Sequence, residues 1–580
     1  MSNKPVYILG TGLSHDGSSC LLKDGHIICA IEKERLSRKK HDGGNDALTV
    51  KYCLDYAGIT VHDLSLMVQA ANFEKDTIQK DRYQGARFFT ADCAVPFVSI
   101  SHHLAHAYSA VGTSPFDEGN VLVIDGCGSP YEQCDDLEGA ELPQSIITGL
   151  YAEKDSFYRF SEDGLFPLYK DFSELNLSQQ GGEYRMPLTT HSIGGLYSKI
   201  SQYIFGNMDD AGKLMGLAPY GNCDRFKESF FLLKDGRVFV NEDSLLQLNR
   251  PAASYQDFKD RFNYFADVAS WAQRDVEEAV VYIVKQRLAS KYHPNLCYAG
   301  GVALNAVANA RILRETPVKN LYMMPAAADN GLAIGCAYYG WLNVLKRKPC
   351  KHDGAICLGK VYTEDEIEAD INRFIADHPG IMISFQKAAN VLDDASRMLA
   401  DGKVIGWFQG GAEFGPRALG NRSILADARS EGVRAFINRD IKFREDFRPF
   451  APAVTGEDVS EYFKYGYESP YMILVDEIKE NYRELYKEVI HVNGSARVQT
   501  VTQNINPTFY GLLKTFKQVS GSGILLNTSF NKKGMPIVET PYQALSLFYE
   551  TKMDAVVIHD YVFTKNQQQV YFASASYKTP

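Results

Sequence analysis

The sequence predicts an α/β protein with more than one domain. Short apolar runs rich in β-branched residues alternate with longer helix-like segments. Most of these runs end at Gly, Asp or Gly-Gly, which places polar loops at the carboxyl ends of strands, where open α/β sheets bind ligands. The chain has 580 residues, which is too many for one hydrophobic core, so roughly two to four domains are expected.

The first part of the chain supplies the clearest strands. We expect strands at Val6–Gly10, Asn120–Asp125, Leu296–Gly301 and Asn320–Pro325. Helix-like segments follow the last two, at 302–313 and 326–340. Paired strand and loop signals near 5–130 and 290–340 suggest a duplicated domain with a cleft between its halves, although no sequence repeat is visible. Residues 151–185 are polar and aromatic and are interpreted as an insertion.

The character of the chain changes at residues 346–359. This segment, KRKPCKHDGAICLG, is basic, contains Pro and Gly, and lacks a helical period. We therefore place a domain boundary there, which gives domains 1–354 and 355–580. The second domain is expected to open with a charged helix at Thr363–Asp377 and to continue with alternating strands and helices.

Composition and charge exclude several classes of function. The net charge of −10 provides no general footprint for nucleic acid or an anionic membrane, which both favour an excess of cations. No apolar run approaches the ~18 residues that span a bilayer, and the first apolar stretch is too short for a signal peptide. The 11 cysteines include no CxxC, which favours reduced thiols. We expect a cytoplasmic protein with no nucleic-acid partner and no membrane association.

Four residues form a candidate metal site. HHLAHAYSA at 102–110 places His102 and His106 four residues apart, on one face of a helix, while His103 points about 100° away. Histidine pairs at this spacing also occur on helices that bind nothing. Asp125 and Asp329, however, each follow an expected strand. Two imidazoles and two carboxylates would make a mixed site suited to Fe(II), Mn or Zn, with room for water or substrate.

The segment from Glu413 to Pro452 is a candidate phosphate site. It holds eight Lys or Arg against six Asp or Glu. Arg417 follows Gly-Pro, and Arg448 precedes Pro. Turns bring guanidinium groups and exposed backbone N–H groups together, and that combination suits a phosphate. The alternative is an ordinary solvated surface of mixed charge.

The same segment carries a family resemblance. EFGPRALGNRSIL, followed by NRDIKFREDFRPFAP, resembles the O-carbamoyltransferase family of nodulation and antibiotic pathways (NodU/CmcH type, which includes tobramycin carbamoyltransferase). The resemblance extends from HDGSS near the N-terminus to LNTSFN near the C-terminus. It implies an actin-like (ASKHA), Kae-like fold for residues 1–354. For residues 355–580 it implies a YrdC-like, twisted open α/β sheet around a positively charged cavity.

The resemblance also implies roles for residues of the first domain. In the family, the segments HHLAHA, IDG and ADNG supply the ligands of a metal, taken to be Fe(2+), although another divalent metal is also allowed. These segments match His102, His106, Asp125 and Asp329 of this chain. His15, in the small HDGSS loop, is expected near the transfer centre as a base or as a group that orients a ligand. Nucleotide or phosphate contacts are expected at Lys40, Lys213, Gly300, Gly301 and Asn305.

In the second domain, we expect a site for carbamoyl phosphate and for ATP with Mg(2+). Arg417, Lys442 and Arg448 supply cations with a catalytic role. Further contacts are expected from Arg497 and Gln499 on one strand, and from Asn527, Thr528 and Ser529 at the end of another. One departure is visible, because many family members read Gln-Gly-Arg-Met where this chain has Gln409-Gly410-Gly411-Ala412. A ligand role for position 411 is therefore in doubt.

The implied activity is that of an ATP-dependent O-carbamoyltransferase. Carbamoyl phosphate and ATP would form carbamoyl adenylate in the second domain, and the first domain would transfer the carbamoyl group to a hydroxyl of a small natural-product acceptor. Two alternatives are a tRNA threonylcarbamoyl-type enzyme and an actin-fold, metal-dependent kinase. The sequence leaves open which molecule is the acceptor and whether the protein forms a homodimer.

Overall fold

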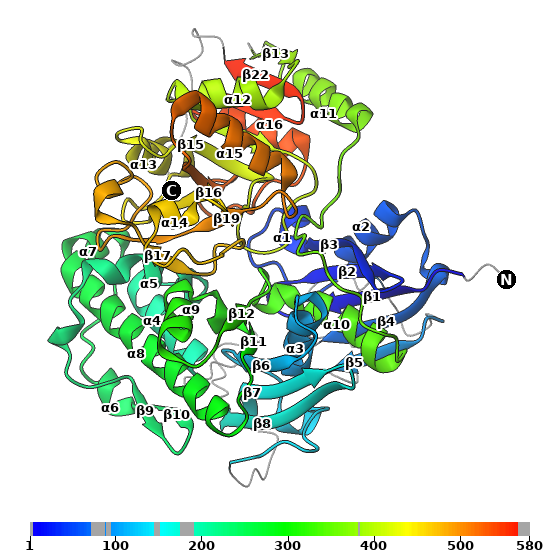
Figure 1. Ribbon diagram of the computed structural model, residues 1–580, viewed down its shortest axis with the longest axis vertical. Coiled ribbons are helices and arrows are strands. Elements are labelled where there is room, and N and C mark those ends of the chain that lie inside the picture. Colours follow the sequence, from blue (N-terminus) through cyan, green and yellow to red (C-terminus); the bar gives the residue numbers. More distant parts are fainter. Residues whose placement is uncertain are drawn as a thin grey trace. The chain divides into compact units, whose positions relative to one another are not determined.

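The computed structural model describes residues 4–70, 88, 94–143, 151–174, 191–380 and 383–565. The chain forms two compact units (Figure 1): unit 1 contains residues 1–37 and 41–354, and unit 2 contains residues 38–40 and 355–580. Both units combine mixed β-sheets with helices, which confirms the α/β class. Within the described residues, no helix is both long enough and apolar enough to cross a bilayer.

Unit 1 contains two sheets of five strands. The first has the order β3-β2-β1-β4-β5 and the second the order β12-β11-β6-β7-β8. The strands of the first sheet are β1 (Tyr7–Gly12), β2 (Ser18–Lys23), β3 (His26–Glu32), β4 (Leu64–Ala70) and β5 (Phe97–Ile100). Those of the second sheet are β6 (Gly119–Ile124), β7 (Tyr151–Ser161), β8 (Gly164–Glu174), β11 (Asn295–Ala299) and β12 (Asn320–Tyr322).

The two sheets repeat one topology. In the first, β1 pairs antiparallel with β2 and parallel with β4. In the second, β6 pairs antiparallel with β7 and parallel with β11. The outer strands also correspond. In the first sheet, β3 pairs antiparallel with β2 and β5 pairs parallel with β4; in the second, β8 pairs antiparallel with β7 and β12 pairs parallel with β11. The expected duplication is therefore present as a repeat of strand order, and this tandem repeat gives unit 1 its actin-like fold.

The interpretation of residues 151–185 as an insertion is wrong for residues 151–174. These residues form β7 and β8, the second and third strands of the second repeat. Polar residues can occupy these buried strands because several of the charged side chains, including Glu153 and Lys170, form ion pairs. Residues 175–185 lie outside the described residues.

Helices surround both sheets of unit 1. They are α1 (Lys33–Ser37), α2 (Ala47–Ala57), α3 (His102–Thr113), α4 (Ile193–Phe205), α5 (Ala211–Leu217), α6 (Glu242–Leu245), α7 (Tyr255–Asp260), α8 (Phe262–Ser290), α9 (Ala306–Glu315) and α10 (Leu332–Tyr339), with a hairpin of β9 (Phe231–Lys234) and β10 (Arg237–Val240). Small residues let α10 approach α3 and β1 closely. A Cβ at Gly335 would lie 1.8 Å from the Ala105 carbonyl oxygen, and one at Gly10 would lie 2.0 Å from that of Ala333.

Unit 2 is built on an eight-stranded mixed sheet of order β13-β22-β21-β14-β15-β20-β16-β19. Its strands are β13 (Ile383–Lys387), β14 (Ile405–Phe408), β15 (Arg422–Asp427), β16 (Ala451–Thr455), β19 (Gln499–Val501), β20 (Leu525–Ser529), β21 (Ala555–Ile558) and β22 (Tyr561–Lys565). Its helices are α11 (Glu364–Asp377), α12 (Val391–Ala400), α13 (Val433–Phe436), α14 (Val459–Tyr462), α15 (Pro507–Ser520) and α16 (Pro541–Glu550).

The side chains of β14 alternate between two apolar layers of unit 2. Trp407 packs in the layer formed with α12 and α15, and Phe408 packs in the layer formed with α11 and α16. Thr363 caps α11 through a capping box with Glu366.

One expectation fails, because Arg497 and Gln499 do not share a strand. Arg497 ends β18 (Ser495–Arg497), which pairs with β17 (Val475–Glu477), whereas Gln499 begins β19 of the large sheet.

Candidate metal centre and arginine cluster

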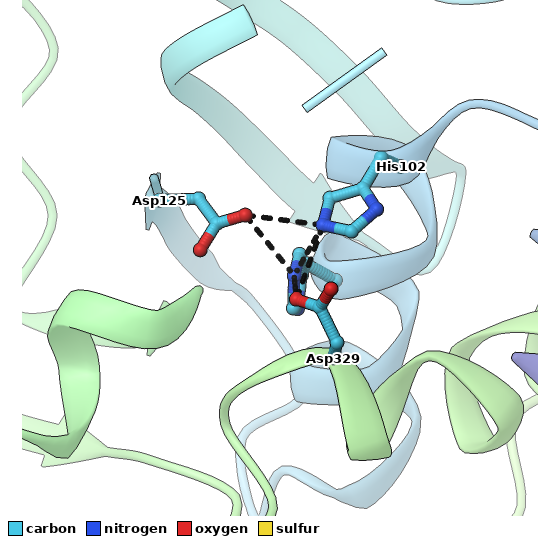
Figure 2. Close-up of side chains that lie close together, drawn as sticks. His102, Asp125 and Asp329 are labelled. Atoms are coloured by element: carbon cyan, nitrogen blue, oxygen red, sulfur yellow. Dashed lines mark hydrogen bonds and ion pairs between the residues drawn. The ribbon is translucent and has the colours of Figure 1, made fainter. Parts of the chain in front are cut away.

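Four potential metal ligands meet in unit 1. His102 and His106 lie on α3, Asp125 follows β6, and Asp329 opens the short turn before α10. The Oδ2 atom of Asp125 is 3.1 Å from His102 Nε2 and 3.9 Å from His106 Nε2. Oδ1 of Asp329 is 3.3 Å and 3.6 Å from the same two nitrogens. Figure 2 shows Asp125 and Asp329 facing His102 from separate elements. The structure thus brings the four expected residues together.

The charges of this cluster favour a bound cation. All four side chains are buried. Burial lowers the pKa of His102, but the opposing effect of Asp329 and Asp125 is larger and raises this pKa to about 10. Burial raises the pKa values of the two carboxyls, but the histidines hold both below their ordinary range. Two buried carboxylates and two imidazole nitrogens are donors that Fe(II), Mn or Zn accept, so the residues fit a divalent metal ion without selecting one of the three.

His15 borders the cluster. Its Nδ1 lies 3.2 Å from Asp329 Oδ2, its Nε2 lies 3.5 Å from Asp16 Oδ2, and its side chain is 44% exposed. Ser14 Oγ also donates a hydrogen bond to Asp329. Burial lowers the pKa of His15, but Asp16 and Asp329 raise it well above the ordinary value. His15 therefore reaches both Asp329 of the cluster and solvent.

The Gly-Gly turn after β11 shapes the cluster. Gly300 has a φ of +91°, and a Cβ there would lie 2.3 Å from the Ile124 carbonyl oxygen. This close approach brings the Gly301 N–H within 2.9 Å of Asp125 Oδ1, to which it donates a hydrogen bond. The two glycines thus orient Asp125, and the nucleotide contact expected of them stays a prediction.

The structure shows protein contacts or charge interactions for the other residues expected at the nucleotide site of the first domain. Asn305 caps α9 by accepting a hydrogen bond from Ala308, and its amide exchanges two hydrogen bonds with Gln273. Lys213 donates to Asp210 Oδ2 at 2.7 Å. Lys40 belongs to unit 2, where its charge contributes to lowering the pKa of Lys442.

Unit 2 contains a cluster of four arginines. The arginine cluster consists of Arg417, Arg444, Arg448 and Arg497, and the charges of neighbouring arginines lower the pKa values of Arg417, Arg444 and Arg497. Burial is the largest cause, and with Arg448 it lowers the pKa of Arg417 to about 10. Among the described residues, no carboxylate pairs with Arg417 or Arg497, and Arg497 Nε is buried without a hydrogen-bond partner. Sequence analysis missed Arg444, although it lies in the same charged segment.

Lys442 is held by the end of β20. Its Nζ donates to the Ser529 hydroxyl at 3.0 Å and to Asn531 Oδ1 at 2.7 Å, and it also contacts the carbonyl oxygens of both residues. The side chain is buried, and burial and the neighbouring arginines lower its pKa. Thr528 lies beside Ser529 on the same strand, opposite Ile424 of β15.

The loop that carries Arg417 is fixed by three buried side chains. Glu413 Oε1 accepts hydrogen bonds from the N–H groups of Leu419, Asn421 and Arg422, at 2.6, 2.7 and 3.2 Å. Gln499 donates to the Leu419 carbonyl, and Asn527 donates to that of Ala418. These three backbone N–H groups are therefore not open to a phosphate, because a carboxylate of the protein already accepts their hydrogen bonds.

Two more residues of this region are structural. The Arg422 guanidinium stacks over Phe408 at 3.5 Å and donates to the Gln409 carbonyl. At position 411, a Cβ would lie only 2.4 Å from the Gly359 carbonyl oxygen. An arginine therefore has no room at this position, which explains the glycine where many family members carry Arg.

Two family models match this chain. The family model described as carbamoyltransferase N-terminus matches residues 7–85 and 60–338, and the one described as carbamoyltransferase C-terminus matches residues 396–565. Nodulation protein NolNO of Sinorhizobium fredii is 32% identical over 588 residues, which cover 95% of this chain and 79% of that protein.

A 3'-hydroxymethylcephem-O-carbamoyltransferase of Streptomyces clavuligerus is 28% identical over 90% of this chain and 92% of that protein. The crystal structure of T. kodakarensis HypF aligns with 60% of this chain and 50% of that chain, with 13% identity and a TM-score of 0.36, which supports no functional conclusion. Because the two family models cover most of the sequence, the chain belongs to the carbamoyltransferase family, and it is a carbamoyltransferase of the type found among nodulation proteins and cephem O-carbamoyltransferases.

Proposed function

We propose that this carbamoyltransferase uses carbamoyl phosphate and ATP to form a carbamate ester on the hydroxyl of a small molecule. The observation that carries the proposal is the arginine cluster of unit 2. The cluster has four partly buried guanidinium groups, and the charges of neighbouring arginines lower the pKa values of three of them, Arg417, Arg444 and Arg497. Among the described residues, Arg417 and Arg497 have no carboxylate partner. Such a cluster is stabilised when polyanions such as ATP and carbamoyl phosphate bind.

The first step is assigned to unit 2. Water cleaves carbamoyl phosphate into carbamate and phosphate, and a carbamate oxygen then attacks the α-phosphate of ATP. The P–O bond to the β-phosphate breaks, so the products are carbamoyl adenylate and pyrophosphate. Arg417, Arg448 and Arg497 would hold the phosphates and offset the charge that moves between them, with Mg(2+) bound to ATP. Lys442 would position the end of β20 through Ser529 and Asn531.

The second step is assigned to unit 1. There the acceptor oxygen attacks the carbamoyl carbon, the bond to AMP breaks, and AMP leaves. With the charge of Asp329 neutralised by a bound cation, the pKa of His15 would fall, and its ring, which reaches Asp329 on one side and solvent on the other, would accept the proton of the acceptor hydroxyl. A divalent metal held by His102, His106, Asp125 and Asp329, with Fe(2+) as the expected ion, would polarise the carbamoyl carbonyl.

The test is a reaction of the purified protein with carbamoyl phosphate, ATP and Mg(2+), first without an acceptor and then with a panel of small hydroxyl compounds. We expect pyrophosphate release that requires carbamoyl phosphate, and a product whose mass increases by one carbamoyl group. ATP consumption to ADP alone would indicate a kinase. Carbamoyl transfer that proceeds without ATP would refute the adenylate intermediate.

A further inference from the structure

The histidines of the metal centre lack the usual orienting contacts. A histidine that binds a metal generally donates its second ring N–H to a carboxylate, a carbonyl or water. Here the Nδ1 atoms of His102 and His106 are buried, and neither has a hydrogen-bond partner among the described residues. The backbone of α3 must therefore set the orientation of both rings, and whatever fixes α3 also fixes the metal centre.

The first turn of α3 is held by groups outside the helix. Ser101, at the N-cap, makes no side-chain cap. Instead, the His102 N–H donates to Ser129 Oγ at 2.9 Å, and the His103 N–H donates to Glu153 Oε2 at 3.2 Å. The same Glu153 oxygen accepts from the Ser129 N–H at 2.9 Å. The first N–H groups of a helix have no partner within it and favour an anion, so Glu153 ties α3 to the loop that follows Asp125.

A β-bulge directs Glu153 to this position. The pairing of β7 with β8 shifts register between Glu153 and Asp155, and bulges of this kind redirect side chains. The loop after Asp125 also approaches closely, because a Cβ at Gly128 would lie 2.7 Å from both Glu153 Cβ and His103 Cδ2. The contact between strand, loop and helix therefore depends on a glycine at position 128.

Lys170 keeps the Glu153 carboxylate charged. Both side chains are 0% exposed, and Lys170 Nζ lies 2.6 Å from Glu153 Oε1 and 2.5 Å from Asp136 Oδ1. Burial raises the pKa of Glu153, but Lys170 and the surrounding donors lower it to about 2. Cys134, Asp136 and Glu153 also have the spacing of metal ligands, but the Lys170 ammonium group already neutralises these carboxylates.

We propose that Glu153, with Lys170 as its counter-ion, is the positioning residue that sets α3 and Asp125 in the geometry of the metal centre. This inference rests on the proposed metal centre and adds a residue that touches neither metal nor substrate. Removing the carboxylate would free the first turn of α3 from the loop after Asp125. The four ligands would then converge less well, and metal affinity would fall about 10–100-fold.

The experiment is a titration with Co²⁺, whose visible absorption reports the coordination geometry of the bound ion. Full-length wild-type protein is treated with a chelator and compared with the Glu153→Ala and Glu153→Gln variants. Asp171→Asn is the matched control, because Asp171 is fully buried in the same hairpin and is ion-paired with Lys154 and Arg237. We expect Glu153→Ala to weaken Co²⁺ binding about 10–100-fold and to change its spectrum, and Asp171→Asn to do neither.

If Glu153→Ala does not fold, Glu153→Gln tests the positioning role of Glu153. A glutamine can turn its oxygen either to the two N–H donors or to Lys170, so it loses one contact in either orientation. We therefore expect weaker Co²⁺ binding in a folded protein. Wild-type affinity and spectrum in both variants would refute the role of Glu153, and so would an equal loss in Asp171→Asn. If wild-type protein bound no Co²⁺, the metal centre itself would be wrong, and this inference with it.

Discussion

The Nε2 atoms of His102 and His106 lie 3.1 Å apart. At this separation, both rings cannot carry a proton on Nε2 without directing two N–H groups at each other. A cation bound by both lone pairs removes the conflict, and Asp329 Oδ1 lies within 3.6 Å of each nitrogen. The spacing of the two rings therefore suits a hydrogen bond from one ring to the other as well as a cation shared by both lone pairs.

The first prediction removes one of these rings. His106→Ala should lose bound metal and carbamoyl transfer to the acceptor, because a site with four protein donors loses most of its affinity without one of them. Formation of carbamoyl adenylate should continue. Metal content after dialysis and pyrophosphate release give the two measurements. His103→Gln, a change at a buried histidine of the same helix that faces Ser156, should keep its metal. Full transfer by metal-free His106→Ala protein would contradict the assignment.

The second prediction separates the two half-reactions by a change in unit 2. Arg448→Ala should lose about 10²–10³ in the rate of adenylate formation, because a charge clamp on the phosphates is removed. Transfer from chemically prepared carbamoyl adenylate should be unaffected. Arg439→Ala is the control, because Arg439 lies in the same segment but its side chain is 72% exposed and paired with Asp440. Loss of both half-reactions in folded Arg448→Ala protein would favour a single composite active site.

The third prediction concerns the loop that carries Arg417. Glu413→Ala leaves the N–H groups of Leu419, Asn421 and Arg422 without their acceptor, at a cost of roughly 1–3 kcal/mol for each buried group. The loop should move, and kcat/KM for carbamoyl phosphate should fall by up to about 10²-fold, because small displacements of a positioning group are costly. Glu413→Gln, which keeps one acceptor oxygen, should recover part of the loss in steady-state kinetics. An unchanged kcat/KM in Glu413→Ala would show that the loop does not depend on Glu413.

The fourth prediction concerns acid stability. The folded-state pKa of Glu153 is about 2, below its ordinary value of 4.5, so its contribution to stability is present above pH 4.5 and is lost as the pH falls toward 2. Wild-type protein should therefore be more stable than Glu153→Gln by an amount that is constant above about pH 5 and shrinks at lower pH. Urea unfolding of both proteins between about pH 6 and pH 3 measures this difference. A difference independent of pH would mean that the charge of Glu153 does not contribute.

The fifth prediction concerns the acceptor. A small-molecule hydroxyl, and no base of a tRNA, should receive the carbamoyl group, because the net charge of −10 opposes the many cationic contacts that nucleic-acid binding requires. Mass spectrometry of tRNA and of small hydroxyl compounds after the same reaction compares the two. Faster modification of RNA than of every small molecule would overturn this assignment.

The meeting of His102, His106, Asp125 and Asp329 could be predicted because the signals in the sequence are local. Histidines four residues apart share a helix face, and carboxylates that follow strands gather at a sheet edge. Glu153 and Lys170 could not be predicted in this way, because polar residues within a strand usually indicate a solvent face, and only the bulge and the pairing of β7 with β6 and β8 bury them. Glu413 was missed because its three partners lie six to nine residues further along a loop, where no periodicity applies.

The discontinuity of unit 2 has a practical consequence for dividing the protein into fragments. Residues 38–40 belong to unit 2 although they are distant from it in the chain, and the Arg38 guanidinium donates to the carbonyl oxygens of Pro536 and Ile537 at 2.8 and 2.7 Å. A fragment that starts at residue 355 would lack residues 38–40 and the two hydrogen bonds of Arg38. Low stability of such a fragment would therefore say little about the stability of the intact unit. A recombinant version should supply the three residues as a separate peptide or through a circular permutation.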